Sequence, residues 1–352
     1  MTSLQEMVKR PGSWLNGSGP HADKILSTRL RLARNLKNVP FPGRARPEQL
    51  SQVLPSVVAA TKKSPLFSEL MVLRSSEMTK ADKQFLVERH LISHDFAEDS
   101  KVGALIIGND ESNSIMINEE DHLRIQVLCS GLQLGGALKL ADKIDEELDA
   151  SLEYAFSDEL GYLTSCPTNV GTGMRASVLI HFPSLVLTRQ ISRVLQGITQ
   201  IGLAVRGFYG EGSEIMGNFF QISNQTTLGL NDKETITSLE RVTNQIMEYE
   251  TKAMELLLKD AKAQVEDKVW RAYGTLKYCK ILTSRELISL ISAVRYGISL
   301  GLTGLCDIAA VNELLILTQP AHIQKLAGRE MTSAERNVMR AEIVHEKLKT
   351  KQ

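Results

Sequence analysis

The character of this sequence changes near Glu234. From Ile25 to about residue 230, short apolar runs typical of β-strands are mixed with helical segments and glycine-rich turns. Beyond Glu234 glycine becomes scarce, and charged residues interleave with Leu, Ile and Met at helical spacing. Two stretches of such different pattern predict a domain of strands and helices followed by an all-helical C-terminal domain.

The boundary between these domains is predicted inside or just after a long helix, which gives domains at 24–260 and 261–352. Residues 1–23 are rich in Gly, Ser and Pro and include Pro11-Gly12. These residue types are typical of loops, so we expect a flexible N-terminal lead-in.

Local patterns predict individual elements. Two apolar runs flank Gly108-Asn109-Asp110 and predict a β-hairpin. Pro183 suits a first helical turn and predicts a helix running to about Ile201. Thr332 and Glu335 have capping-box spacing for a last helix. The remaining predictions are a helix over 132–152 and strands over 174–182, 203–208 and 216–223.

Charge and cysteine content narrow the functional classes. Lys and Arg together number 41, as do Asp and Glu, so there is no basic excess of the kind that nucleic-acid binding favours. Four widely spaced cysteines without a CxxC pair argue against a structural zinc site or a disulfide framework. The start is not signal-like and no apolar run could span a bilayer, so we expect a soluble cytoplasmic protein without membrane contact.

The densest charged cluster directly follows an apolar run. Asn118 to Arg124 (NEEDHLR) holds three carboxylates, one imidazole and one guanidinium, straight after the strand-like Ser114 to Ile117. Charged residues usually occupy solvated faces, so such a cluster behind a buried strand is unusual. A strand end can hold a reactive carboxylate rigidly.

Several arginines border strands or glycines, where solubility does not require them. Any one alone would be interpreted as a surface residue. As a set they favour a polyphosphate ligand, because each guanidinium can bind phosphate oxygens in a bidentate manner. The sequence contains no Walker motif and no protein-kinase glycine loop, so an ATP site here would be built from arginines. These arginines are Arg29, Arg31, Arg124, Arg175 and Arg206.

Glu120 and Glu211 together suit a guanidinium substrate. A guanidinium has a pKa above about 12, so it is a poor nucleophile until a proton is drawn off. One carboxylate can take that proton while the other holds the planar group in line. Glu211 lies in a glycine-flanked loop that could fold over a ligand; the alternative is an ordinary solvated loop residue.

Three further side chains have two interpretations each. Cys166 is either a low-pKa thiol near the substrate or a small buried hydrophobe. His90 and His122 either contact a nucleotide or are structural histidines. The residues alone do not decide between these.

Three motifs resemble those of the phosphagen (guanidino) kinases, such as arginine and creatine kinase: Ser27 to Arg31 (STRLR), Asn118 to Arg124 (NEEDHLR) and Cys166 to Ala176 (CPTNVGTGMRA). The match is ordered and spans about residues 24 to 230. The resemblance implies an α+β fold with an antiparallel sheet flanked by helices. It also implies ATP with Mg²⁺ as cofactors and phosphoryl transfer to a guanidinium nitrogen.

The resemblance also implies roles for single residues. Glu120 resembles the catalytic carboxylate, Glu211 a second one in a mobile loop, and Cys166 and Glu119 lie near the substrate. No residue is implied as a direct metal ligand. The implied ATP- and phosphate-binding positions are Ser27, Thr28, Arg29, Leu30, Arg31, His90, Arg124, Arg175, Ala176, Ser177, Val178, Leu179, Arg206, Gly207, Phe208, Tyr209 and Gly210.

Three departures resemble the bacterial protein-arginine kinases of this family. Only 26 residues precede Ser27, where small-molecule members carry a helical domain. Thr227 stands where those enzymes usually have arginine, and the helical tail has no counterpart in them. A site without its lid domain can admit a side chain attached to a protein.

This branch implies a homodimer formed through the tail, and a phosphoarginine-binding RDxxRA motif there. The chain has Arg336, Asn337, Arg340 and Ala341 at these positions, so the aspartate is replaced. Arg336 and Arg340 are one helical turn apart and could clamp a phosphate; the alternative is a solvated helix face. The implied partners are protein substrates, an activator called McsA and the Clp protease of the stress response.

Two other functions stay open on the sequence. One is a small-molecule guanidino kinase acting on free arginine or a similar compound. The other is a non-catalytic regulator that binds phosphoarginine through the helical tail.

Overall fold

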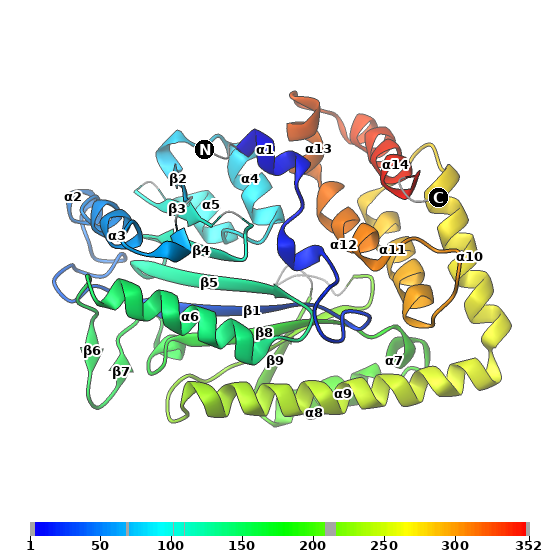
Figure 1. The fold of residues 1–352 in the computed structure, drawn as a ribbon, viewed down its shortest axis with the longest axis horizontal. Helices are drawn as coiled ribbons and strands as arrows, with labels where there is room; N and C mark the ends of the chain where they lie inside the picture. Colours follow the sequence, from blue (N-terminus) through cyan, green and yellow to red (C-terminus); the bar gives the residue numbers. More distant parts are fainter. Residues whose placement is uncertain (1–3, 68–69, 101, 109, 208–215, 350–352) are drawn as a thin grey trace.

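The computed structural model describes residues 4–67, 70–100, 102–108, 110–207 and 216–349. Its centre is an eight-stranded antiparallel sheet with the order β2-β3-β4-β5-β1-β8-β10-β9 (Figure 1). The strands are β1 (Ile25–Arg34), β2 (Met71–Arg74), β3 (Ala104–Ile107), β4 (Asn113–Ile117), β5 (Leu123–Ser130), β8 (Met174–His181), β9 (Leu203–Arg206) and β10 (Phe219–Asn224). A separate hairpin joins β6 (Phe156–Ser157) to β7 (Gly161–Tyr162).

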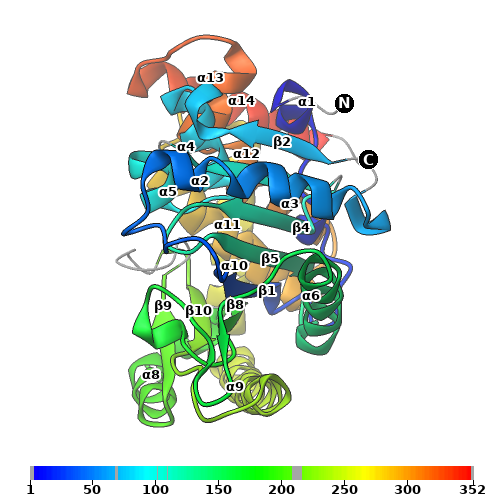
Figure 2. The ribbon, with the colours of Figure 1, turned by 90° about the vertical axis from the view of Figure 1, so that its left-hand side faces the viewer.

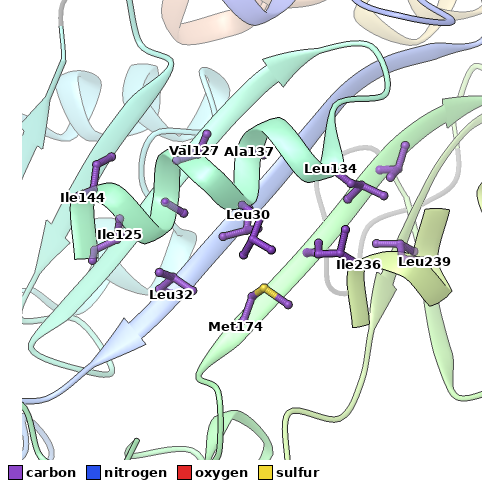
Figure 3. Packing of buried hydrophobic residues seen from close by; sticks show 14 of the residues in the cluster. Leu30, Leu32, Ile125, Val127, Leu134, Ala137, Ile144, Met174, Ile236 and Leu239 are labelled. Carbon is purple, nitrogen blue, oxygen red and sulfur yellow. The ribbon is translucent and has the colours of Figure 1, made fainter. Parts of the chain in front are cut away.

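One face of the sheet is buried by helices α3 (Val53–Thr61), α6 (Leu134–Asp149) and α9 (Asp232–Asp260). Alternate strand residues point into this core, because successive side chains of a strand face opposite sides. Leu30, Leu32 and Met174 meet α6 and the start of α9 there (Figure 3). Their neighbours on the other face are therefore available for a site.

The tail covers one end of that other face (Figure 1). Leu26, Leu128, Leu179 and Phe219 of the sheet share a second core with it. The tail is all-helical, and the predicted fold class is confirmed. Its helices are α10 (Lys262–Tyr278), α11 (Ser284–Ser299), α12 (Ile308–Leu317), α13 (Pro320–Ala327) and α14 (Ser333–Lys349).

Several local predictions are confirmed, including the β3–β4 hairpin and the capping box of α14, in which the side chains of Thr332 and Glu335 each accept the other residue's backbone N–H. The break between α9 and α10 falls at Ala261; the exact domain limits stay a prediction.

The remaining helices are α2 (Pro47–Leu50), α4 (Lys80–Glu88), α5 (His94–Asp99), α7 (Pro183–Leu187) and α8 (Ile191–Gln200), with short 3-10 turns η2 (Pro65–Phe67), η3 (Ser75–Glu77) and η4 (Pro167–Asn169).

The expected loose lead-in is wrong for residues 4–23. They form α1 (Leu4–Lys9) and the turn η1 (Ser13–Leu15). Trp14 is only 2% exposed and packs with Leu15 between the sheet and the tail. The glycines and prolines indicated a loop, but the apolar side chains among them bind this segment to both domains.

The single helix expected from Pro183 to Ile201 is also wrong. It divides into α7 and α8, with Arg189 in a left-handed conformation at φ 59°. The carboxylate of Glu250 accepts the backbone N–H groups of Ser184 and Leu185 at 2.7 and 2.9 Å. This bond from α9 fixes the short α7, and α8 then turns toward the sheet edge at β9 and β10 (Figure 2).

No helix in the ranges that the structure describes is both long and apolar enough to cross a membrane.

Candidate functional site

The five arginines singled out in the sequence lie on one face of the sheet, opposite α6. Arg31 on β1 stands directly opposite Arg175 on β8, so their side chains emerge side by side. Arg29 lies two residues earlier on the same face. On β5, Gln126 pairs with Arg31. Arg124 lies two residues before Gln126, so its side chain is on the same face of the sheet. Arg206 at the end of β9 pairs with Gln221, which accepts a hydrogen bond from Arg29 at 3.1 Å.

These guanidiniums perturb one another strongly. Burial lowers the pKa of Arg29 to about 10, and the nearby charges of Arg175, Arg124 and Arg206 add to this shift. Burial also lowers the pKa of Arg31 well below its usual range, with further lowering by Arg29, Arg124 and Arg175. Such crowding of like charge fits a ligand with several negative charges.

A small cavity adjoins the end of this row that is nearer the tail. Trp14, which the sequence analysis missed, lines it together with His90, and Arg29 and Ser177 lie on the side of the arginines. The rings of Trp14 and His90 meet edge to face, with centroids 5.6 Å apart. Burial lowers the pKa of His90 to about 3, helped by Arg29, so its imidazole is neutral at physiological pH. The other lining residues are Ser27, Leu128, Leu179 and Gln221.

Not every position implied for ATP faces this site. Thr28 is buried and donates its hydroxyl to the carbonyl of Gly131 at 2.7 Å. The side chains of Leu30, Ala176 and Val178 lie in the core beneath the sheet. The implied motif runs along the strands without a gap, whereas a strand exposes only every second side chain to one face. These four residues support the site from behind.

The carboxylates of the NEEDHLR segment converge on Arg124. Glu119 Oε2 lies 2.8 Å and Glu120 Oε2 lies 3.2 Å from Arg124 Nη2. Glu119 also accepts the hydroxyl of Ser93. The side chain of Glu120 stays 40% exposed. Burial raises the pKa of Glu120, with Arg124 opposing this and the charges of Asp121 and Glu119 adding to it.

The other residues of the segment, Asp121 and His122, hold it in place through hydrogen bonds. Asp121 Oδ1 accepts the side-chain amide of Asn35 at 2.6 Å and the backbone N–H of Ser165 at 2.7 Å. His122 is fully buried, and its Nδ1 accepts the backbone N–H of Leu36 at 3.1 Å. The structural interpretation of His122 is therefore correct, and a role in nucleotide contact is excluded by its burial.

Cys166 lies beside Glu120. Its thiol is 3.0 Å from the hydroxyl of Thr168 and hydrogen bonds to the Glu120 carboxylate. Thr227 is buried beneath this segment and donates its hydroxyl to the carbonyls of Thr168 and Val170 at 2.9 and 2.7 Å. Thr227 thus holds the Cys166 segment in place.

Part of the predicted site lies outside the described residues. This holds for Glu211 and for the neighbouring Phe208, Tyr209 and Gly210. Gly207 is the last described residue before them and is buried beside the end of β9.

The expected phosphate clamp in the tail is not formed in this structure. Arg340 is 1% exposed and donates to the carbonyls of Thr318 and Leu282, both at 2.9 Å, and to Asn337 Oδ1 at 2.7 Å. Arg336 instead donates to the carbonyl of Met331 at 2.6 Å. Ala341 is buried in the tail core, so a solvated helix face is excluded for it and for Arg340. Arg340 has a structural role here, because it donates to carbonyls after α12 and before α11.

Among the residues whose positions the structure gives, no group of three or more His, Cys, Asp or Glu side chains could hold a metal ion. A Mg²⁺ ion at this site fits a binding mode through substrate phosphates and water, with Glu119 and Glu120 as the nearby carboxylates.

Comparison with known proteins shows the family to which the chain belongs. An ATP:guanido phosphotransferase catalytic-domain model matches residues 52–253, and a model for the C-terminal domain of the protein-arginine kinase McsB matches residues 262–352. A protein-arginine kinase of Brevibacillus brevis is 45% identical over 350 residues, which cover 99% of this chain and 98% of the relative. One of Symbiobacterium thermophilum is 46% identical over 347 residues, covering 97% and 98%.

Solved structures share the fold. A duplicated taurocyamine kinase from Schistosoma mansoni superposes with a TM-score of 0.60 at 25% identity, over 71% of this chain and 36% of that longer chain. Lombricine kinase superposes with a TM-score of 0.58 at 22% identity, over 70% and 72%. With both family models and full-length relatives matched, this chain belongs to the ATP:guanido phosphotransferase family and, within it, to the protein-arginine kinases.

Proposed function

We propose that this protein transfers the γ-phosphoryl group of MgATP to a guanidinium nitrogen of arginine side chains in other proteins. One contact supports this above all others. Arg124 belongs to the row of arginines and also binds Glu120, at 3.2 Å. A phosphate-binding surface and a carboxylate for a guanidinium therefore adjoin each other at a single side chain.

The arginines neutralise the charge of the phosphates and hold them in position. Arg29, Arg31, Arg124, Arg175 and Arg206 bind the phosphates and the planar transferring group, where charge spreads over three equatorial oxygens. Guanidiniums already fixed by the sheet need little reorganisation as that charge develops. Glu119 and Glu120 are the carboxylates near which a Mg²⁺ ion would be held with the substrate phosphates, and the ion would supply positive charge that offsets the phosphate charge. Trp14 and His90 border the nucleoside end of the site.

Glu120 acts on the acceptor. As the N–P bond forms and the bond from the γ-phosphorus to the β,γ-bridging oxygen breaks, ADP leaves and the guanidinium loses a proton to a carboxylate. The raised pKa of Glu120 makes it a stronger base than an ordinary carboxylate. Glu211 is the proposed second carboxylate that aligns the acceptor, and Cys166 lies next to Glu120.

The accessibility of Glu120 favours an acceptor attached to a protein. Its side chain is 40% exposed, and Cys166 and Thr168 lie at the surface of the neighbouring loop. An arginine carried on a polypeptide can reach such a carboxylate without being enclosed. By family resemblance, we further propose a cytoplasmic homodimer joined through the tail, an activator McsA, and Clp-dependent degradation of the marked proteins in the stress response.

Transfer can be tested with MgATP and two acceptors in parallel, free arginine and an unfolded arginine-rich protein. We expect an acid-labile, base-stable phosphate on arginine residues of the protein, identified by mass spectrometry under non-acidic conditions. Transfer to free arginine alone would make this a small-molecule guanidino kinase. Nucleotide binding without transfer to either acceptor would overturn the proposed activity.

A further inference from the structure

Three consecutive residues at the end of α4 are each tied to a different part of the molecule. Glu88 binds the tail, Arg89 binds the N-terminal segment, and His90 lines the cavity next to Arg29. Helices α1, α4 and α13 lie side by side around this point (Figure 1). The described activity gives no role to the first two of these residues.

His90 has an unusual backbone conformation. Its φ is 60°, in the left-handed region, where glycine is the usual residue. The N–H of His90 donates to the carbonyl of Val87 at 2.9 Å and that of Leu91 donates to the carbonyl of Leu86 at 3.0 Å, the two bonds of a Schellman helix end. A histidine at this position costs roughly 1 kcal/mol relative to glycine, so a side-chain function favours its presence.

Glu88 connects this helix end to the tail. Its side chain is 3% exposed, and its two oxygens accept the backbone N–H groups of Ala321 and His322, each at 2.9 Å. Both N–H groups belong to the first turn of α13, where they have no partner within the helix. A carboxylate at this end is also favoured by the helix dipole. The bond therefore fixes the last turn of α4 to the first turn of α13.

Arg89 fixes the same turn to the N-terminal segment. It forms a buried ion pair with Glu111, with Nε donating to Oε2 at 3.0 Å, and donates to the carbonyl of Arg10 at 2.7 Å. That segment continues to Trp14, whose ring meets His90. From the sheet side, Gln126 donates to the carbonyl of His90 at 2.8 Å. The backbone at His90 is thus fixed by its neighbours, and its ring contacts Trp14.

We propose that Glu88 is a positioning residue through which the tail holds His90 in the nucleotide site, so that nucleotide affinity depends on the hydrogen bonds between Glu88 and α13. This rests on the proposed function for the nucleotide site itself. The coupling runs from the N–H groups of α13 to Glu88, along two peptide bonds to His90, and then to the pocket that Arg29 shares. Glu88 does not line that pocket.

A merely structural Glu88 would hold the two domains together without affecting the nucleotide. A second contact between the same helices allows the two roles to be separated. Lys325 of α13 forms an ion pair with Asp82, in the first turn of α4 and away from His90. Lys325→Met weakens the contact between the helices but leaves the Glu88 bonds intact, so it serves as the matched control.

The test is a thermodynamic cycle with Glu88→Ala and His90→Asn, since asparagine tolerates the left-handed conformation. The readouts are the Kd of MgADP by calorimetry, KM for ATP, and KM for a protein acceptor. We expect Glu88→Ala to weaken MgADP binding about tenfold, the coupling typical of groups that act through one another. In the His90→Asn background the same change should have almost no effect. KM for the protein acceptor and the MgADP affinity of Lys325→Met should stay near wild type.

An equal loss in both backgrounds, or unchanged MgADP affinity in folded Glu88→Ala, would overturn the proposal. Glu88→Gln keeps the shape and one acceptor oxygen, so it should show an intermediate loss and still be folded if the alanine variant is not. MgADP binding requires no phosphoryl transfer. A wild-type protein that binds MgADP but modifies no arginine would therefore refute the proposed function. The MgADP affinities of the variants would still test the coupling between Glu88 and His90.

Discussion

Asp121 accepts the backbone N–H of Ser165 at 2.7 Å, and this bond joins the loop that carries Glu120 to the loop that carries Cys166. The same oxygen also accepts the amide of Asn35. Asp121→Ala should therefore leave both loops less fixed and lower kcat about tenfold, because small misplacements of reacting groups are costly. Steady-state kinetics with a protein acceptor would measure this. Asp121→Asn retains the Oδ1 acceptor and should keep most of the activity; equal losses in the two variants would contradict the argument.

Glu120→Gln should lower kcat by about 10²- to 10⁴-fold, because the amide cannot accept the guanidinium proton. The Kd of MgADP should stay within about threefold, since Arg124 keeps Glu119 as a partner at 2.8 Å. Acid-labile phosphoarginine formation and calorimetry measure the two effects. Glu240→Gln, on the exposed side of α9, is the control and should behave as wild type. Near-normal turnover in Glu120→Gln would remove Glu120 from the mechanism.

Arg175→Lys should raise KM for ATP and lower kcat, with a combined loss of about 100-fold in kcat/KM. The lysine keeps the charge but loses the planar fork that binds two phosphate oxygens. The position opposite Arg31 in the sheet register makes this geometry hard to replace. Arg193→Lys on the exposed face of α8 is the matched control, expected to leave kcat/KM unchanged. If both lysine variants keep full activity, charge alone suffices at this site.

His181 should make the protein less stable in acid. Burial lowers its pKa well below the usual value, and it lies between Ser292, at 2.8 Å from Nε2, and the ring of Phe219. Below about pH 6.5 the unfolded chain binds a proton here that the folded chain does not, so the free energy of unfolding falls by up to about 1.4 kcal/mol per pH unit. Urea unfolding at pH 7.5 and 5.5 measures this slope.

His181→Gln should show a smaller loss of stability between those two pH values than the wild type. Glu88, whose pKa burial raises to about 7, acts in the opposite direction in both proteins and cancels in the comparison. Identical slopes would show that His181 does not control the acid response.

Arg34→Met should destabilise the fold by about 3–5 kcal/mol, since it leaves the Asp145 carboxylate buried without its partner. Arg34 Nη2 lies 2.6 Å from Asp145 Oδ2, and the guanidinium stacks 3.5 Å from the centre of the Tyr162 ring. The double variant Arg34→Met, Asp145→Leu should recover much of this loss in urea unfolding. A double variant as unstable as the single one would contradict the ion-pair explanation.

The parts of the site that sequence could predict are local. Arg29 and Arg31 alternate along one strand, so their common face follows from the two-residue period of β-structure. Glu120 and Arg124 are four residues apart, and their contact needs only a tight turn between β4 and β5. The change of pattern near Glu234 likewise predicted the helical tail, because periodicity is a property of short windows.

The parts that sequence could not predict depend on contacts between distant segments. Glu88 meets Ala321 across 233 residues, and no spacing rule connects them. Trp14 looked like part of a loop because its neighbours are glycine and proline, yet tertiary packing places its ring beside His90. Asn35 and Gln221 belong to no recognisable motif. For Gln221, the one local indication of a position on the site face was its alternation with the apolar Phe220 and Ile222.

The row of arginines destabilises the folded state when no ligand is bound. Arg31 and Arg175 face each other with the same charge on adjacent strands, and burial removes much of the water that would screen them. An anion that binds between them stabilises the folded state, by an amount that grows with the logarithm of the anion concentration once this exceeds its Kd. Folding and nucleotide supply are thereby linked: when ATP and ADP are scarce, a larger fraction of the molecules is unfolded, and the lifetime of the kinase depends on the same pool of nucleotide that it consumes.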